Sequence, residues 1–196
     1  MEHAEFIGYV RRQVAELAVG ASTLRNQGGS GLVRIAREHF KQVNLTKYSS
    51  ANNQDEFSRL LDDDTDKLMR SFPPGAHQNW GAARKAMNLF LRNATYNRFL
   101  FHEFGLARIE KWLEVPLDND VAKGLISDFQ NGKFVLPAGN LLPDWKNIKS
   151  LKQEENKLFQ NAAQALADSK GIARVHVDLL YWRRRTAEQT DSGNKQ

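Results

Sequence analysis

The apolar residues of this chain recur at helical spacing over nearly its whole length, and this pattern limits the folds open to it. Phe6, Val10, Val14 and Leu17 follow one another at intervals of three or four residues, which places them on one face of a helix. Alternation typical of a strand is confined to the short segment 133–136. The sequence therefore predicts an all-α fold, with helices at about 6–18, 32–40, 55–72, 80–104, 106–113, 118–130, 145–151, 153–169 and 172–185.

Turn residues separate these helices without marking a clear linker between domains. The Pro-Pro-Gly sequence at 73–75 ends the third predicted helix, and a glycine-rich turn at 26–31 precedes the second. We expect a single helical domain over residues 1–185, in which the first three helices and the later ones form two lobes with a cleft between them. The polar tail at 186–196 is expected to be disordered.

The composition excludes several classes of site. The 196 residues include no cysteine, which rules out disulfides, thiolate zinc sites and cysteine-ligated iron–sulfur clusters. The five histidines are scattered without ligand spacing, so we expect no metal and no cofactor. No run approaches the roughly 18 apolar residues of a membrane span, and no secretory leader is evident, so we expect a cytoplasmic protein that acts as a monomer away from membranes. A net charge of +5 permits a phosphate-binding face without requiring one.

A lysine one turn inside an apolar helix is the first candidate for chemistry. Gly81 and Ala83 are small, so the backbone amides at the helix start could approach a phosphate, which the helix dipole would favour. Lys85 follows, and the neighbouring charge of Arg84 would favour its neutral, nucleophilic form. Asn88 could hydrogen-bond the lysine or fix a helix pair. A lone helical lysine is more commonly only solvated.

An aspartate at a predicted helix start is the second candidate. Asp118 follows Pro116-Leu117 and precedes a helical pattern that includes Val121 and Leu125, which is an N-cap position. A carboxylate held there by backbone amides can stabilise an oxocarbenium-like sugar, and it can relay a proton from a lysine. An aspartate before a helix is more often a cap and nothing else.

The two segments together resemble the helix-hairpin-helix DNA glycosylase superfamily. The sequence Gly81-Ala82-Ala83-Arg84-Lys85 is similar to the hairpin that carries the family's catalytic lysine, and Pro116-Leu117-Asp118 is similar to the segment that carries its catalytic aspartate. Asp118 lies 33 residues after Lys85, a spacing similar to that of the archaeal 8-oxoguanine glycosylase branch. The resemblance covers about residues 73–125. Ala83 stands at the second hairpin glycine, and the turn before the helix is longer than in the family.

This resemblance implies an enzyme that flips a base out of duplex DNA and cleaves its N-glycosidic bond. Lys85 would form a Schiff base and nick the strand, or Asp118 would act with water and leave an abasic site. The motif implies DNA contacts by Trp80, Gly81, Ala83, Arg84 and Asn88. Candidates for the pocket of the extruded base are the aromatic and polar side chains of Gln27, His176 and Trp182.

The sequence does not identify the base that such an enzyme would release. An oxidised purine such as 8-oxoguanine would fit a repair enzyme, and a modified cytosine such as glucosylated hydroxymethylcytosine would fit anti-phage defence. The alternative to catalysis is a helical DNA-binding or adaptor protein that uses the hairpin for phosphate contacts alone. A helical toxin-like or antitoxin-like interaction module is a third possibility, suggested only by the size of the chain.

Overall fold

The structure is a computed structural model that describes residues 1–24, 26–76, 78–137 and 141–181. The described residues form helices and connecting segments and contain no β-strand, so the all-α prediction is confirmed. The chain divides into two compact units, Met1–Leu113 and a second that begins at Glu114. In the part of the chain described, no helix combines the length and the apolar character needed to cross a membrane.

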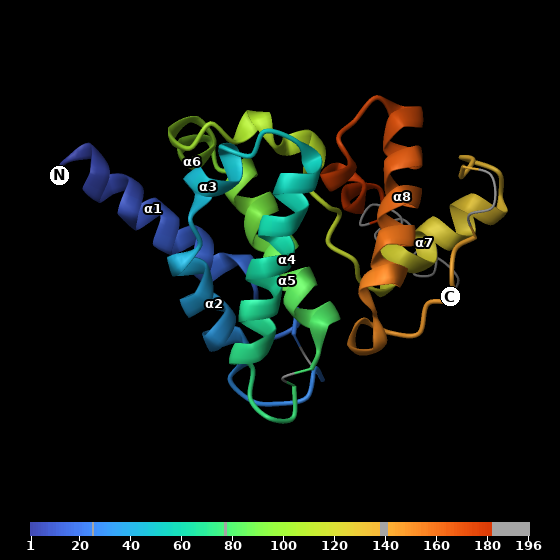
Figure 1. The fold of residues 1–196 in the computed structure, drawn as a ribbon, viewed down its shortest axis with the longest axis horizontal. Helices are drawn as coiled ribbons and strands as arrows, with labels where there is room; N and C mark the ends of the chain where they lie inside the picture. Colours follow the sequence, from blue (N-terminus) through green and yellow to red (C-terminus); the bar gives the residue numbers. More distant parts are fainter. Residues whose placement is uncertain (25, 77, 138–140, 182–196) are drawn as a thin grey trace, which may run out of the picture. The chain divides into compact units, whose positions relative to one another are not determined.

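The first unit contains most of the helices, shown in blue to green in Figure 1. Its elements are α1 (His3–Ala18), α2 (Leu32–Gln42), α3 (Leu45–Ser49), α4 (Gln54–Ser71), α5 (Trp80–Tyr96) and α6 (Arg98–Glu103), followed by the 3-10 turns η1 (Leu106–Arg108) and η2 (Glu110–Trp112). The predicted helices at 6–18, 32–40 and 55–72 are confirmed as α1, α2 and α4. The short α3 has no counterpart among the predicted helices.

Helix α5 forms the centre of the first unit because its small residues let neighbouring helices approach closely. Ala83, Ala86 and Ala94 are completely buried. Helices α1, α2 and α4 all pack against α5, and Phe90 of α5 stacks on Phe40 of α2 with ring centroids 4.8 Å apart. The helix that carries Lys85 is therefore fixed by packing from several sides.

The second unit is built on α7 (Asn119–Gln130) and α8 (Gln153–Lys170), with the 3-10 turns η3 (Ile148–Ser150) and η4 (Arg174–His176). Helix α7 packs against α8, and η4 folds back onto α8. The predicted helices at 118–130 and 153–169 are confirmed. Leu125, Phe159 and Val175, from three different elements, are buried in this core.

The long helix predicted over 80–104 is broken at Asn97, and the prediction is wrong at that point. The backbone of Asn97 is extended, and its side-chain oxygen accepts hydrogen bonds from the amides of Phe99 and Leu100 at 3.1 Å each. An asparagine satisfies free amides at a helix start, so α6 begins here as a separate helix. A continuous helix at 106–113 was also expected, and the structure has η1 and η2 there instead, after Gly105 in the left-handed region with φ 60°.

Two further predictions about helices need correction. The segment 145–151 forms only η3, which Asn147 caps by accepting a hydrogen bond from the amide of Ser150. The predicted helix at 172–185 does not begin at its first residue, because Gly171 (φ 63°) caps the end of α8 and η4 follows; residues 178–181, the last ones described, are helical. Residues from 182 onward, including the predicted tail at 186–196, lie outside the described part of the chain.

Candidate active site

Asn79 begins the helix that carries Lys85 and ties a distant loop to it. Its side-chain oxygen accepts a hydrogen bond from the amide of Ala82 at 3.0 Å, which caps α5. Its side-chain nitrogen donates to the backbone oxygen of Gln27 at 3.0 Å and to the Gln27 side-chain oxygen at 2.9 Å. Gln27, predicted for a base pocket, is therefore brought to the N-terminal end of α5 across 52 residues of sequence.

The loop that contains Gln27 contacts the turn before α5 through two glycines. A Cβ on Gly28, whose φ is 104°, would lie 2.1 Å from the carbonyl oxygen of Gly75, and a Cβ on Gly75 would lie 2.2 Å from that of Gly28. Neither position has room for a side chain. The glycine-rich turn and the Pro-Pro-Gly turn are thus packed against each other, and Asn79 fastens the pair to α5.

The first turn of α5 is buried, and its amides bond to Asn79. Gly81, Ala82 and Ala83 are buried. Asn79 accepts hydrogen bonds from two amides of this turn. Its side-chain oxygen accepts from the amide of Ala82, and its backbone carbonyl accepts from the amide of Ala83 at 3.3 Å. The Ala82 and Ala83 amides are therefore satisfied within the protein, and the expected contact of Gly81 and Ala83 with a phosphate stays a prediction.

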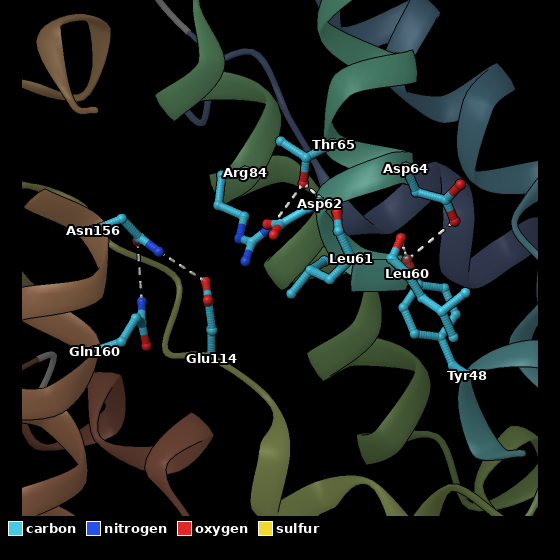
Figure 2. A network of polar contacts seen from close by, with 10 residues as sticks. All are labelled: Tyr48, Leu60, Leu61, Asp62, Asp64, Thr65, Arg84, Glu114, Asn156 and Gln160. Atoms are coloured by element: carbon cyan, nitrogen blue, oxygen red, sulfur yellow. Dashed lines mark hydrogen bonds and ion pairs between the residues drawn. The ribbon is translucent and has the colours of Figure 1, made fainter. Parts of the chain in front are cut away.

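Arg84 is a buried cation with partners on α4. Its guanidinium donates to the Asp62 carboxylate at 2.7 Å and to the Thr65 hydroxyl at 3.2 Å, both on α4 (Figure 2). It also lies 5.3 Å from the centre of the Trp80 ring. The Arg84 side chain is only 5% exposed and links α4 to α5, and the expected DNA contact of Arg84 stays a prediction. The sequence did not identify Asp62 or Thr65.

Lys85 lies on a different face of α5 from Arg84. Consecutive helical residues diverge, and Lys85 shares its face with Gly81 one turn before and Asn88 one turn after. Lys85 is half-buried, whereas Asn88 is 3% exposed. The structure therefore brings Gly81, Lys85 and Asn88 together along one side of a helix whose position is fixed by packing.

Asp118 is the N-cap of α7, as predicted. One of its carboxylate oxygens accepts hydrogen bonds from the amides of Asp120 and Val121, each at 3.0 Å. The residue is half-buried and follows the buried sequence Val115-Pro116-Leu117. Two amides and the positive end of the α7 dipole thus hold a negative charge at a defined place in the second unit.

A buried glutamine of α8 clamps the segment that leads into Asp118. The Gln160 side chain accepts a hydrogen bond from the Val115 amide at 3.0 Å and donates one to the Val115 carbonyl at 2.9 Å. Asn156, one turn earlier, accepts from Gln160 at 3.3 Å and donates to the Glu114 carboxylate at 3.2 Å (Figure 2). This clamp fixes the chain three residues before Asp118. Nothing in the spacing of the sequence pointed to it.

A second polar anchor in this unit lies at the end of the described chain. The Tyr181 hydroxyl donates to the buried carboxylate of Asp128 at 3.3 Å, and Lys133 pairs with the same carboxylate at 3.0 Å. The Tyr181 ring rests on Gly124, where an added Cβ would lie 2.2 Å from the ring. Residues 178–181 are therefore held against α7.

The remaining candidates occupy scattered places. His176 is half-buried in η4, and Trp182 lies outside the described residues. Lys85 belongs to the first unit, and Asp118 and His176 belong to the second. No group of three or more His, Asp or Glu side chains is placed to hold a metal ion within the described ranges. Comparisons of the chain with family models, with curated proteins and with solved structures found no match.

Proposed function

We propose that this protein is a DNA glycosylase of the helix-hairpin-helix type, in which Lys85 and Asp118 act on one extruded nucleotide. In this proposal the two helical units form lobes around duplex DNA, and the enzyme works as a monomer without metal or cofactor. The observation that carries it is the state of Asp118, whose carboxylate is held by two amides of α7 at 3.0 Å in the motif that resembles the family's catalytic aspartate.

The proposed reaction needs an anion that does not move and an amine that can attack. As the C1′–N bond breaks, its electron pair leaves with the base, and positive charge develops on the sugar. A carboxylate already oriented by amides stabilises that charge without reorganising. Nζ of Lys85 then bonds to C1′ and gives up its proton, for which Asp118 is the acceptor. The departing base takes a proton from water. The C1′–O4′ bond of the aminal then breaks, O4′ takes up a proton, and a C1′=N Schiff base forms. Hydrolysis of this Schiff base frees Lys85 and gives an abasic site, and β-elimination of the 3′ phosphate gives a nick.

The partners of the neighbouring Arg84 are compatible with an assignment of chemistry to Lys85. Arg84 is bonded to Asp62 and Thr65, so its charge serves the fold. Lys85 is half-buried on a separate face, beside Asn88. We propose that Trp80 contacts DNA, that the buried Asn88 positions Lys85 from the same face of α5, and that Gln27, anchored by Asn79, faces the extruded base.

The test is release of a base from duplexes that carry 8-oxoguanine or glucosylated hydroxymethylcytosine, read as abasic sites and nicks. We expect one of the two duplexes to be cleaved, and we expect Lys85→Gln and Asp118→Asn each to lower the rate at least about 100-fold, which is typical for loss of an acid–base or electrostatic group. Lys47→Gln and Asp144→Asn change the same residue types at exposed sites of the same two units, and they should leave the rate unchanged.

The same assay also distinguishes a DNA glycosylase from a DNA-binding adaptor protein. A DNA-binding adaptor predicts no base release from either duplex and equal DNA binding by the wild type, Lys85→Gln and Asp118→Asn. That combination would overturn the proposed function. A preference for the oxidised purine would assign the enzyme to repair, and a preference for the glucosylated cytosine would assign it to anti-phage defence.

A further inference from the structure

Exposed aromatic and aliphatic side chains gather on one face of the first unit. Tyr9 is 53% exposed and Leu17 is 71% exposed on α1, while Tyr96 at the end of α5 is 45% exposed and Phe99 on α6 is 40% exposed. These are half of the large exposed hydrophobic residues in the part of the chain that the structure describes. Single exposed apolar residues are ordinary, but a group on neighbouring helices marks an interaction surface.

The packing between helices places these residues on one continuous surface. Phe99 of α6 meets Phe6 of α1 edge to face, with ring centroids 4.9 Å apart. Farther along α1, an open hollow of about 240 Å³ lies between α1 and the α5–α6 junction, lined by Val14, Leu17, Asn93, Tyr96 and Asn97. Helix α1 packs on both α5 and α6 (Figure 1). The surface therefore runs along α1 from Tyr9 to Leu17 and across to Tyr96 and Phe99.

An arginine lies over each exposed ring of this surface. The guanidinium carbon of Arg12 is 4.5 Å from the Tyr9 ring centre, that of Arg98 is 4.8 Å from Phe99, and that of Arg92 is 5.8 Å from Tyr96. Two acids lie one turn from the rings: Glu103, after Phe99 on α6, which pairs with His3 at 2.8 Å, and Glu5, before Tyr9 on α1. Glu16, on the same helix, is already paired with Arg37 and Lys41 of α2. The surface is therefore aromatic and positively charged.

We propose that this aromatic–arginine face (Tyr9, Arg12, Leu17, Arg92, Tyr96, Arg98 and Phe99) binds a single strand of DNA. Unstacked bases pack on the rings and in the hollow, and the phosphates lie at the arginines. Aromatic rings beside cations are the combination with which proteins hold single strands without reading sequence, because every base has a π-face and every phosphate a charge. An acidic peptide would use the arginines but would leave the rings without a partner of matching shape.

The choice of DNA over RNA rests on the proposed function, and α5 connects the two sites. The part of α5 that is not buried runs along one stripe, from Lys85 through Leu89 and Arg92 to Tyr96. Eleven residues of helix separate Lys85 from Tyr96, or about 16 Å. At about 3.4 Å per nucleotide along a strand, a lesion-containing strand would reach the face roughly five nucleotides from the reacting sugar. The face would thus hold DNA that has opened next to the extruded base.

The experiment is fluorescence anisotropy of a labelled oligothymidine of about 12 nucleotides, a length within the range of known single-strand sites. We expect Tyr96→Ser and Tyr9→Ser each to weaken binding about fivefold or more, the loss of one stacked base. We expect Arg98→Ala to reduce the slope of log affinity against log salt concentration by about 0.7, because one phosphate contact disappears. Leu141→Ser and Arg70→Ala are the matched controls, since both residues are exposed and lie off the face, and neither should change the affinity. Melting temperatures of all variants identify any loss of fold.

Two outcomes would overturn this inference: equal strand binding by the wild type, Tyr9→Ser and Tyr96→Ser, or a preference for oligouridine over oligothymidine. A dimer that dissociates in Tyr96→Ser, without binding of oligothymidine, would also overturn it. A protein that binds the strand through Tyr96 but releases no base contradicts the glycosylase proposal alone. One that releases a base but binds the strand equally in every variant contradicts the strand-binding face alone.

Discussion

At the scale of single residues, buried charge in the first unit is matched by partners from a neighbouring helix. Arg84 has three partners. The Asp62 carboxylate neutralises its charge, the Thr65 hydroxyl accepts a hydrogen bond from the guanidinium, and the Trp80 ring lies against its flat face. A lysine at this position would lack the fork geometry and the stacking surface. Arg84 therefore links α4 to α5, and Lys85, on a different face of the helix, is the residue to which the proposed function assigns chemistry.

We predict that Asp62→Asn lowers the free energy of unfolding by about 2 kcal/mol. The substitution keeps the shape of the side chain but leaves a buried guanidinium with a neutral partner, which costs more than loss of an ordinary surface pair. Asp63→Asn is the matched control, since Asp63 is the next acid along α4 and is exposed, and it should change stability by less than about 0.5 kcal/mol. Urea titration followed by circular dichroism measures both. Equal effects of the two variants would contradict the structural role of Arg84.

His39 makes the stability of the first unit depend on pH. Burial lowers the pKa of His39 from 6.5, with the charge of Lys67 acting in the same direction and that of Asp64 opposing it. Its Nε2 is buried without a hydrogen-bond partner among the described residues. The unfolded chain therefore binds a proton at His39 more readily than the folded chain does. The free energy of unfolding has its full value above about pH 6.5 and decreases as the pH falls below that value.

We predict that His39→Gln flattens the pH dependence of stability between about pH 5 and pH 6.5, where the unfolded histidine titrates. One proton accounts for at most about 1.4 kcal/mol per pH unit, which sets the largest change in slope. His102→Gln, at an exposed position on α6, is the control. Urea titrations at a series of pH values provide the slopes, and an unchanged slope in His39→Gln would refute this account.

At the scale of elements, both candidate residues are placed by polar clamps that join segments distant in sequence. Asn79 joins the loop at Gln27 to the start of α5, and Gln160 joins α8 to the segment before Asp118. Each clamp uses a buried amide side chain that both donates and accepts, which satisfies backbone groups that would otherwise be buried without partners.

We predict that Gln160→Leu destabilises the second unit by about 3 kcal/mol, because the amide and the carbonyl of Val115 both lose a buried partner. Gln164→Leu, one turn later, removes only an exposed hydrogen bond to Asp168, and it should be nearly neutral. Hydrogen exchange of the Val115 amide provides a local readout, since it should accelerate in Gln160→Leu and not in Gln164→Leu. Unchanged exchange would show that the clamp does not hold this segment.

These clamps also explain how much of the structure could be predicted. Local patterns were sufficient for α1, α2, α4, α7 and α8, because each carries a complete apolar stripe, and the cap at Asp118 followed from an aspartate before such a stripe. The break at Asn97 was missed because the apolar pattern continues across it, although asparagine is a preferred cap. Asn79 could have been recognised by the same preference. The pairs Asp62–Arg84 and Val115–Gln160 could not, since partners 22 and 45 residues apart leave no periodic trace.

At the scale of the whole molecule, the proposed chemistry joins two units that each hold one of its residues. Lys85 lies on the central helix of the first unit, and Asp118 caps a helix of the second, immediately after the boundary at Leu113 and Glu114. Within the second unit, Gln160 clamps Val115, three residues before Asp118. The account therefore requires both residues to act on one sugar.

In the most direct test, the protein is mixed with duplex DNA that carries the base it is found to release, and the mixture is reduced with borohydride. Mass spectrometry then maps the site of the covalent product. The account predicts a protein–DNA adduct at Lys85 that is absent in Lys85→Gln and strongly reduced in Asp118→Asn, while Lys47→Gln forms it as the wild type does. An adduct mapped to another lysine, or an adduct of undiminished yield in Asp118→Asn, would contradict the claim that Lys85 and Asp118 form one active site.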